Sequence, residues 1–298
     1  MSTHLWNSGP EEKLIAVIGA TGMLGAPVVA QLLDDGFTVR VLSRNPIAAK
    51  EQFGTRPEYC YADVTDHDSL LHAFEGCDAV HLNLNSDQDA EPEDVFHQGL
   101  INVAEAAKEC GVSRISIIAG DWEPDPNHSW SRRAEFSKGI LALEASGIPT
   151  VVWGCTWFYE SLDYFVLPER ALMVGMQPLT WHFVAASDYA KMVAAVMADE
   201  DFTSNKRFTV HGPKGYKMFD ALKLYCELLR PGLPVEQLSI EDTKKFAQED
   251  EEYGWLEHFA DFMAPFETFG ENGNPKEAQA LLSEPMLTLE EWAKEQLD

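Results

Sequence analysis

A strand, a glycine turn and a helix follow one another without interruption near the start of the chain. The apolar run Leu14–Ile18 leads into Gly19, Gly22 and Gly25, and a helical pattern extends from Ala26 to Leu33. Glycine suits such a turn because a Cβ would block the tight bend, the approach of a phosphate or the packing of helix against strand. The bare N–H groups and the helix N-terminus then favour a pyrophosphate. The pattern therefore predicts a nucleotide-binding α/β sheet, although the spacing is GxxGxxG rather than GxGxxG.

The second predicted strand, residues 37–43, indicates which dinucleotide binds. Its end carries Ser43, Arg44 and Asn45, with no acidic residue among them. A carboxylate at this place binds the ribose 2′-hydroxyl of NAD, whereas an arginine accommodates a 2′-phosphate. We therefore expect NADP(H) as the cofactor, with Arg44 at the phosphate. The alternative is that Arg44 is a solvated loop residue.

Strands alternate with helices through the first half of the chain. Further strands are predicted over residues 58–64, 78–84, 114–120 and 149–153, and helices over 67–74, 95–110 and 131–146. This alternation is typical of a doubly wound parallel sheet, a Rossmann α/β fold, whose ligands bind at the carboxyl ends of the strands.

Three parts are expected along the chain: a polar arm over residues 1–12, a dinucleotide-binding core over 13–155, and a smaller substrate-binding lobe over 156–298. Within the last part, a helix at 187–198 and a strand at 207–211 are expected to return to the core. A helix is predicted over 216–229 and another over 289–296. The acidic stretch between them is expected to consist mainly of loops.

The balance of charge and the cysteine pattern exclude several classes of partner. The net charge of −27 argues against nucleic acid and anionic membranes, which attract cationic surfaces. The five cysteines are dispersed and the nine histidines form no HxH or HExxH pattern, so we expect reduced thiols, no metal site and a cytoplasmic location. No apolar run approaches the ~18 residues of a membrane span, and the start has no signal-peptide pattern. We expect a monomer or homodimer.

Several segments together carry a resemblance to a known family: GATGMLG (Gly19–Gly25), VRVLSRNP (Val39–Pro46), ADVTD (Ala62–Asp66), NVAEAAKECGVSRI (Asn102–Ile115), LEASGIPTVV (Leu143–Val152) and HFVAASDYAKMV (His182–Val193). In this order the chain resembles the atypical short-chain dehydrogenase/reductases, particularly the NmrA-like and isoflavone-reductase-like group. Beyond about Glu236 the match is loose.

The resemblance implies a set of cofactor-binding residues. Those expected at the pyrophosphate and the adenosine half are Gly19, Thr21, Gly22, Met23, Leu24, Gly25, Ser43, Arg44, Asn45, Asp63 and Val64. Those expected from the middle of the cofactor to its nicotinamide end are Asn83, Leu84, Lys138, Gly154, Thr156 and Trp157. Many members add a basic residue shortly after the arginine, but Ile47 and Ala48 stand there in this chain, with Lys50 two positions further on.

The catalytic positions depart from the wider superfamily. Its typical members use a serine after the fifth strand and Tyr-x-x-x-Lys on the next helix, where the phenol gives a proton to the developing alkoxide. Here the serine position reads Ala119-Gly120, and the residue four before Lys138 is Ala134. Asp121 or His128 is a conceivable replacement acid, although a polar loop is the simpler interpretation. A carbonyl reductase of the usual kind is therefore not expected.

Two hypotheses of different classes remain. The first is an NADPH-dependent reductase of a small cyclic or aromatic molecule, with Lys138 in the catalytic role. The second is an NADP(H)-binding redox sensor without turnover. A sugar-nucleotide epimerase is a weaker third, because that chemistry relies on the missing tyrosine. A substrate would bind in a pocket lined by Asp121, Trp122, His128, Trp157, Phe158, Tyr159 and Trp181.

Overall fold

A seven-stranded parallel sheet forms the centre of the computed structural model, which describes residues 13–84, 91–249 and 251–297. Its strands, in spatial order, are β3 (Glu58–Tyr61), β2 (Thr38–Ser43), β1 (Leu14–Ile18), β4 (Ala79–Leu82), β5 (Arg114–Gly120), β6 (Thr150–Cys155) and β9 (Lys206–Val210). The chain order reverses at the β1–β4 boundary, the place where a doubly wound sheet opens a ligand crevice. The predicted doubly wound parallel sheet is confirmed.

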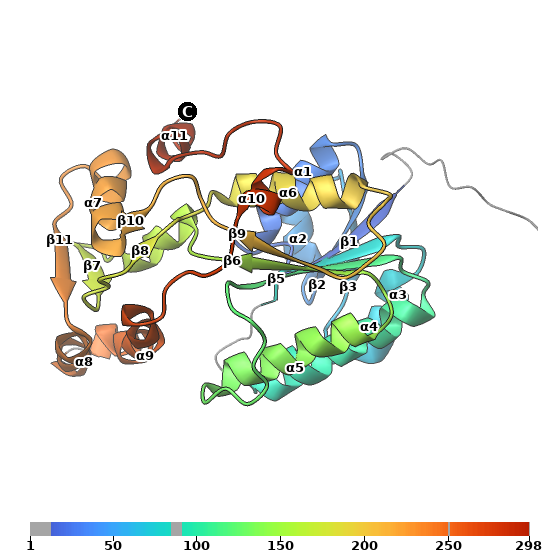
Figure 1. Cartoon of the computed structure of the whole chain (residues 1–298), viewed down its shortest axis with the longest axis horizontal. Helices are drawn as coiled ribbons and strands as arrows, with labels where there is room; N and C mark the ends of the chain where they lie inside the picture. Colours follow the sequence, from blue (N-terminus) through green and yellow to red (C-terminus); the bar gives the residue numbers. More distant parts are fainter. Residues whose placement is uncertain (1–12, 85–90, 250, 298) are drawn as a thin grey trace, which may run out of the picture.

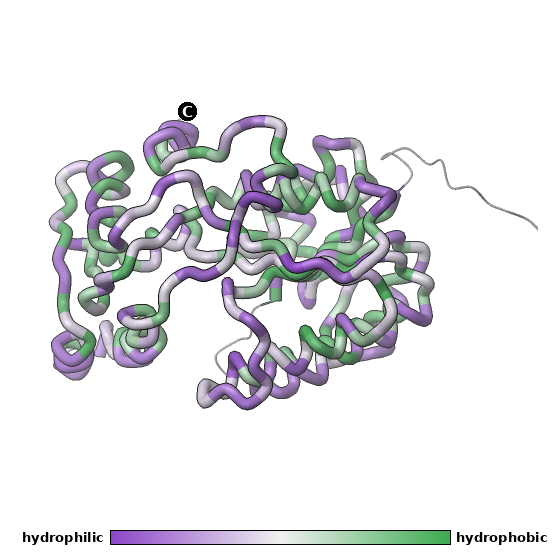
Figure 2. Tube along the Cα trace, in the orientation of Figure 1, coloured by the Kyte–Doolittle hydropathy of each residue, from purple (hydrophilic) through white to green (hydrophobic). Residues whose placement is uncertain are grey.

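Helices cover both faces of this sheet (Figure 1). On one face lie α1 (Gly25–Asp34) and α6 (Ala186–Ala198). On the other face lie α3 (His67–Phe74), α4 (Gly99–Glu109) and α5 (Ser131–Ala145). The helix α2 (Pro46–Phe53) packs beside β2 and β3. In Figure 2 the strands run through the hydrophobic interior, whereas hydrophilic residues concentrate on the outer helix turns and loops.

Local sequence signals start these helices. Asp66 caps α3 by accepting a hydrogen bond from the backbone N–H of Ser69, and Asn45 caps α2 in the same way from Ala48, with Pro46 next in the chain.

Among the described residues, no helix combines the length and the apolar character that crossing a bilayer requires.

The C-terminal lobe has its own core, built around Tyr159, Leu162, Met173 and Leu222. Two small sheets support it, one of β7 (Ala171–Val174) with β11 (Val235–Leu238) and one of β8 (Thr180–Trp181) with β10 (Tyr216–Lys217). Its helices are η3 (Tyr159–Phe165), α7 (Met218–Leu229), α8 (Ile240–Glu249), η4 (Glu251–Tyr253), α9 (Trp255–Met263), η5 (Ala264–Glu267), α10 (Lys276–Gln279) and α11 (Leu289–Glu295).

The structure corrects several predicted boundaries. The expected strands 58–64 and 78–84 end early, at Tyr61 and Leu82, while the sixth strand continues to Cys155. A π-helical segment, η2 (Glu93–Gln98), precedes α4 where one continuous helix was expected. The expected arm at residues 1–12 lies outside the described residues.

The prediction of a loop-rich stretch before the last helix was wrong, because α8 and α9 fill much of it. In α9 the buried residues Leu256, Ala260 and Met263 recur at helical spacing, and the rest of the helix carries two acidic residues together with exposed aromatic rings. The high density of acidic residues hid this apolar face in the sequence.

Candidate functional site

The glycine turn between β1 and α1 is closed by backbone contacts that exclude side chains. Gly19 has φ of +69°, and a Cβ there would collide with the carbonyl oxygen of Asn83. A Cβ on Gly25 would collide with the carbonyl oxygen of Gly19. Gly22 differs, because a Cβ on it would meet only the carbonyl oxygen of Gly19, at 3.4 Å. Gly19 and Gly25 therefore allow the turn to fold, and Gly22 leaves its outer side open.

A cavity of about 270 Å³ opens beside this turn, at the carboxyl ends of β1, β2, β3 and β4. Nine of the residues expected to bind the cofactor line it: Gly19, Thr21, Ser43, Arg44, Asn45, Asp63, Val64, Asn83 and Leu84. Gly22, Met23, Leu24 and Gly25 lie in the adjoining turn and the start of α1. Residues from four separate segments thus converge where the sequence predicted.

Hydrogen bonds fix the backbone at the rim of this cavity. Ser43 Oγ accepts from the backbone N–H of Asn45 at 3.0 Å, so the turn that carries the exposed Arg44 is held in one shape. Asp63 Oδ1 accepts from both the backbone N–H and the hydroxyl of Thr65, at 2.9 and 2.8 Å. The start of α1 has no acidic residue in its first turn and no side-chain cap, so its N–H groups can face an anion.

Asn83 presents a polar atom without a protein partner at this cavity. Among the described residues, nothing accepts a hydrogen bond from its buried Nδ2, and its Oδ1 lies 3.5 Å from the hydroxyl of Tyr189. Buried polar groups are nearly always paired in native proteins. An unpaired donor on a cavity wall therefore fits a ligand that brings an acceptor, such as a dinucleotide.

A buried hydrogen-bond network lies directly behind Asn83. The Tyr189 hydroxyl lies 3.2 Å from Nε2 of His81, and Nδ1 of His81 lies 2.8 Å from Oγ of Ser116. Trp153 Nε1 also donates to that oxygen, at 2.8 Å. Burial lowers the pKa of His81 to about 3, a shift that the Asn83 side-chain oxygen, acting as a hydrogen-bond acceptor, only partly offsets, so the imidazole is neutral at pH 7. No local sequence pattern indicates this network, because Ser116, Trp153 and Tyr189 lie at least 35 positions from their partners in the chain.

A second cavity, of about 450 Å³, lies at the carboxyl ends of β5 and β6 and beside β9. Asp121, Trp122 and Gly154, three of the residues predicted at the substrate and nicotinamide side, line it. The Trp122 indole covers Gly120, where a Cβ would collide with the ring, and the Arg133 guanidinium lies 5.2 Å from the centre of the indole. Arg133 and Arg207 also line this cavity, so it is more polar than the predicted aromatic pocket.

Lys138 lies on α5 in a local ion pair. Its Nζ is 2.6 Å from Oε1 of Glu135, and Nδ1 of His97 lies 3.2 Å from the other carboxylate oxygen. Ala134 precedes Lys138 by one helical turn, so the position four residues before the lysine offers no phenol. Glu135 was missed, although a Glu–Lys spacing of three on a helix is a readable signal of an ion pair. Lys138 itself lines neither cavity described above.

The remaining substrate-pocket candidates pack elsewhere. Phe158, Tyr159 and Trp181 are buried in the protein core, and the Tyr159 hydroxyl donates to the carbonyl of Leu287. These rings fill the interior, where their apolar area is removed from water, and they line neither cavity described above. Trp157 is partly buried among aromatic rings of the lobe, including Phe266 at 5.0 Å between centroids.

His128, Thr156 and Cys155 have structural partners. His128 Nδ1 accepts from the backbone N–H of Trp130, and its Nε2 lies 3.3 Å from Arg133. Thr156 Oγ1 donates to the carbonyl of His182 at 2.7 Å. Burial raises the pKa of the Cys155 thiol, with Asp121 adding to the shift, which suits an inert thiol rather than a nucleophile.

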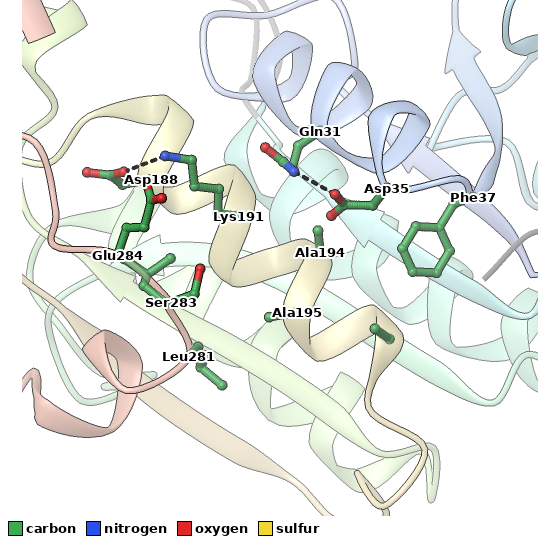
Figure 3. A pocket seen from close by; sticks show the side chains of 12 residues that line it. Gln31, Asp35, Phe37, Asp188, Lys191, Ala194, Ala195, Leu281, Ser283 and Glu284 are labelled. Atoms are coloured by element: carbon green, nitrogen blue, oxygen red, sulfur yellow. Dashed lines mark hydrogen bonds and ion pairs between the residues drawn. The ribbon is translucent and has the colours of Figure 1, made fainter. Parts of the chain in front are cut away.

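A third cavity, of about 540 Å³, lies on the face of the sheet that α1 and α6 cover (Figure 3). It is bordered by α1, α6 and the segment 281–284, with the Lys191–Asp188 ion pair on its wall. Its lining includes neither the glycine turn nor the carboxyl ends of the strands, so we do not assign it to the cofactor.

Comparisons with known proteins relate this chain to NAD(P)H-binding proteins. A family model described as NAD(P)H-binding matches residues 19–143. The NmrA-like family domain-containing oxidoreductase hkm9 of Aspergillus hancockii is 38% identical over 175 residues, which are 56% of this chain and 52% of that protein. The chain spans about half or less of the length of the first curated relatives that it matches.

Solved structures share the fold over nearly the whole chain. Citrobacter sp. triphenylmethane reductase complexed with NADP(H) has a TM-score of 0.75 and 19% identity, covering 94% of this chain and 99% of that chain. The NADPH-dependent quinone oxidoreductase QOR2 of Escherichia coli, complexed with NADPH, has a TM-score of 0.72 and 22% identity, covering 95% and 100%. At 19% and 22% sequence identity, these similarities show a shared fold and nothing further.

Proposed function

We propose that this chain, of which residues 19–143 match an NAD(P)H-binding family model and which has NmrA-like oxidoreductase relatives, is an NADPH-dependent reductase of a small cyclic or aromatic molecule. The observation that carries the proposal is the cavity at the β1–β4 switch point, where the glycine turn, Arg44 and the unpaired Nδ2 of Asn83 meet. These groups offer backbone amides, a guanidinium and an amide donor to a polyanionic ligand.

In this proposal each group has a defined task. The glycine turn and the start of α1 bind the pyrophosphate, Arg44 binds the 2′-phosphate, and Asn83 donates a hydrogen bond to the middle of the cofactor. Arg44 matters more than usual because the chain carries a net charge of −27, so a polyanion must bind against an unfavourable mean field. Lys138, which lines neither cavity, is proposed to hold the nicotinamide ribose once the cofactor is bound.

The alanine at position 134, one helical turn before Lys138, restricts the substrate class in this proposal. NADPH supplies a hydride when bound, and a ketone receiving it would develop an oxyanion that needs a nearby proton donor. The positions where the superfamily places that donor hold Ala119 and Ala134. Quinones, conjugated enones and iminium-type dyes suit this site better, because they delocalise or lose charge as the hydride arrives. The named activities of the dye and quinone reductases with this fold support this choice.

A second function is favoured by the position of Trp122. Its indole covers Gly120 at the end of β5, next to the expected nicotinamide site. A ring held there, with Arg133 against its face, would keep a substrate out. A cofactor-binding redox sensor without turnover is therefore the second candidate.

One experiment separates the two candidates. NADPH oxidation is followed at saturating cofactor against panels of quinones, enones and cationic triphenylmethane dyes. If the protein is a reductase, we expect saturable turnover with at least one panel, and a higher rate with NADPH than with NADH. Cofactor binding with no turnover in any panel contradicts the reductase and leaves the sensor. The sensor in turn requires a protein partner whose recovery in a pull-down changes with NADPH.

A further inference from the structure

Two histidines and a glutamate that are distant in sequence meet beside the β6 and β9 ends of the sheet. His182 follows β8, His211 follows β9, and Glu271 lies between η5 and α10. One ligand atom from each side chain can be chosen so that all three lie within 4.8 Å of one another. The sequence predicted no metal site, because the ligands come from three separate segments rather than from one short motif.

The geometry within this cluster is compact. Nδ1 of His182 lies 2.6 Å from Oε2 of Glu271, and the backbone N–H of His182 donates to the other carboxylate oxygen. The His182 and His211 rings lie nearly parallel, 13° apart, with their centres separated by 6.0 Å. Asp121 Oδ2 lies 2.8 Å from Nε2 of His211. Two imidazoles and two carboxylates thus share a small volume.

Two glycines make this convergence possible. Gly212 donates its backbone N–H to the carbonyl of His182 at 2.9 Å, and a Cβ on Gly212 would collide with the carbonyl oxygen of Phe183. A Cβ on Gly215 would lie 3.0 Å from Nε2 of His182. The absence of side chains at these two positions therefore allows the segments that carry His182 and His211 to approach each other.

Burial and charge suit a divalent cation. The Glu271 and His211 side chains are 8% and 9% exposed, so the carboxylate has lost most of its hydration, whereas His182 is 39% exposed and leaves a route from solvent. Removing a carboxylate from water is costly unless a cation or several donors compensate. Two neutral imidazoles with one carboxylate form the donor set with which proteins bind Zn²⁺ while leaving a further position open.

We propose that His182, His211 and Glu271 bind a divalent transition metal ion of the Zn²⁺ type, with Asp121 orienting the His211 ring. A carboxylate that holds the second ring nitrogen of a metal-bound histidine is the usual outer partner in such sites. The inference does not depend on cofactor binding, because none of the three ligands lines the dinucleotide cavity.

Metal binding here would fasten a long connection to the sheet. Glu271 belongs to the chain that runs from α9 past β9 to α10 (Figure 1). The next residue, Asn272, donates its backbone N–H to Asp121 at 2.9 Å, and a Cβ on Gly273 would collide with the side chain of Thr209. A bound ion would join this connection to two strand ends, and would therefore stabilise the folded state by mass action.

To test this proposal, Co²⁺ and Zn²⁺ are titrated into the full-length protein after treatment with a chelator. We expect one Co²⁺ per chain, visible ligand-field absorption typical of a low-coordinate nitrogen and oxygen site, displacement of Co²⁺ by Zn²⁺, and a higher thermal midpoint with Zn²⁺. His182→Asn and Glu271→Gln should abolish the absorption, and Asp121→Asn should weaken binding about 10–100-fold.

The matched control is His72→Ala, which removes an exposed histidine on α3. It should leave Co²⁺ binding unchanged. Circular dichroism of each variant checks that the fold persists. The proposal is overturned if Co²⁺ gives no ligand-field absorption with the wild-type chain. It is equally overturned if folded His182→Asn and Glu271→Gln variants bind Co²⁺ as the wild type does.

Discussion

The carbonyl oxygen of Gly19 occupies the place that a Cβ on Gly25 would need. This contact brings the end of β1 and the start of α1 together without an intervening side chain. Gly22, between them, donates its backbone N–H to the same oxygen at 3.2 Å, yet has room for a methyl group. The turn therefore requires glycine at Gly19 and Gly25, whereas the position of Gly22 has room for a small side chain.

Alanine at these two glycines should therefore have different effects. Gly25→Ala forces backbone atoms apart and should lower the free energy of unfolding by about 3 kcal/mol. Gly22→Ala should change that free energy little, and should weaken NADPH binding by placing a methyl group towards the pyrophosphate. Urea unfolding and calorimetric titration of both variants measure the two effects. Equal losses of stability in the two variants would contradict this difference between Gly25 and Gly22.

Arg44 should determine the choice between NADPH and NADH. Arg44→Ala removes a charge-assisted hydrogen bond to the 2′-phosphate, worth about 1.5–3 kcal/mol, so NADPH should bind roughly 10–100-fold more weakly. NADH lacks the phosphate and should bind with nearly unchanged affinity. Calorimetric titration of the variant with each cofactor checks this. The assignment fails if both affinities fall by the same factor.

Lys138 should affect cofactor binding at the nicotinamide end. Lys138→Ala should lower both NADPH affinity and any turnover, because the amine would no longer hold the nicotinamide ribose. Lys191→Ala is a matched control, since Lys191 also pairs with an acidic residue three positions away, Asp188, but lies on α6 beside a different cavity. Titration of both variants with NADPH compares their affinities. Similar affinities in the two would show that Lys138 does not contribute to cofactor binding.

The buried His81 should make the protein less stable in mild acid. Its pKa is about 3 in the folded state and about 6.5 when unfolded, so below pH 6.5 the unfolded chain binds a proton that the folded chain does not. Stability from this group is complete above pH 6.5 and declines as the pH falls towards 3. Between pH 7 and 5 the loss is about 2 kcal/mol.

Urea unfolding at pH 7 and pH 5 measures that loss. In His81→Gln the decline between the two pH values should be smaller by about the same amount, because glutamine does not titrate. His72→Gln, at an exposed position on α3, should decline as the wild type does. A His81→Gln variant that keeps the full decline would show that other groups cause it.

The sequence predicted the sheet, and it placed at the carboxyl ends of the strands most of the residues that line one cavity, because both depend on local patterns. The apolar run Leu14–Ile18, the glycine turn and the strand that ends at Arg44 are each contiguous, and parallel strands bring their carboxyl ends to one edge. The cap of α3 at Asp66 was readable for the same reason.

Contacts between distant segments could not be predicted in this way. The network of Asn83, Tyr189 and His81 joins residues more than 100 positions apart, and no local pattern indicates such a pairing. The burial of Phe158, Tyr159 and Trp181 depends on how the lobe packs. Aromatic residues near a strand end are compatible with both a pocket and a core, and only the packing distinguishes them.

The most direct test of the account is calorimetric titration of the purified full-length protein with NADPH and NADP⁺. Amide groups of the glycine turn, the Arg44 guanidinium and the unpaired donor of Asn83 should together give saturable binding of one dinucleotide per chain. The account predicts this one-to-one binding, tighter for NADPH than for NADH. Absence of binding with both NADPH and NADP⁺ would contradict it.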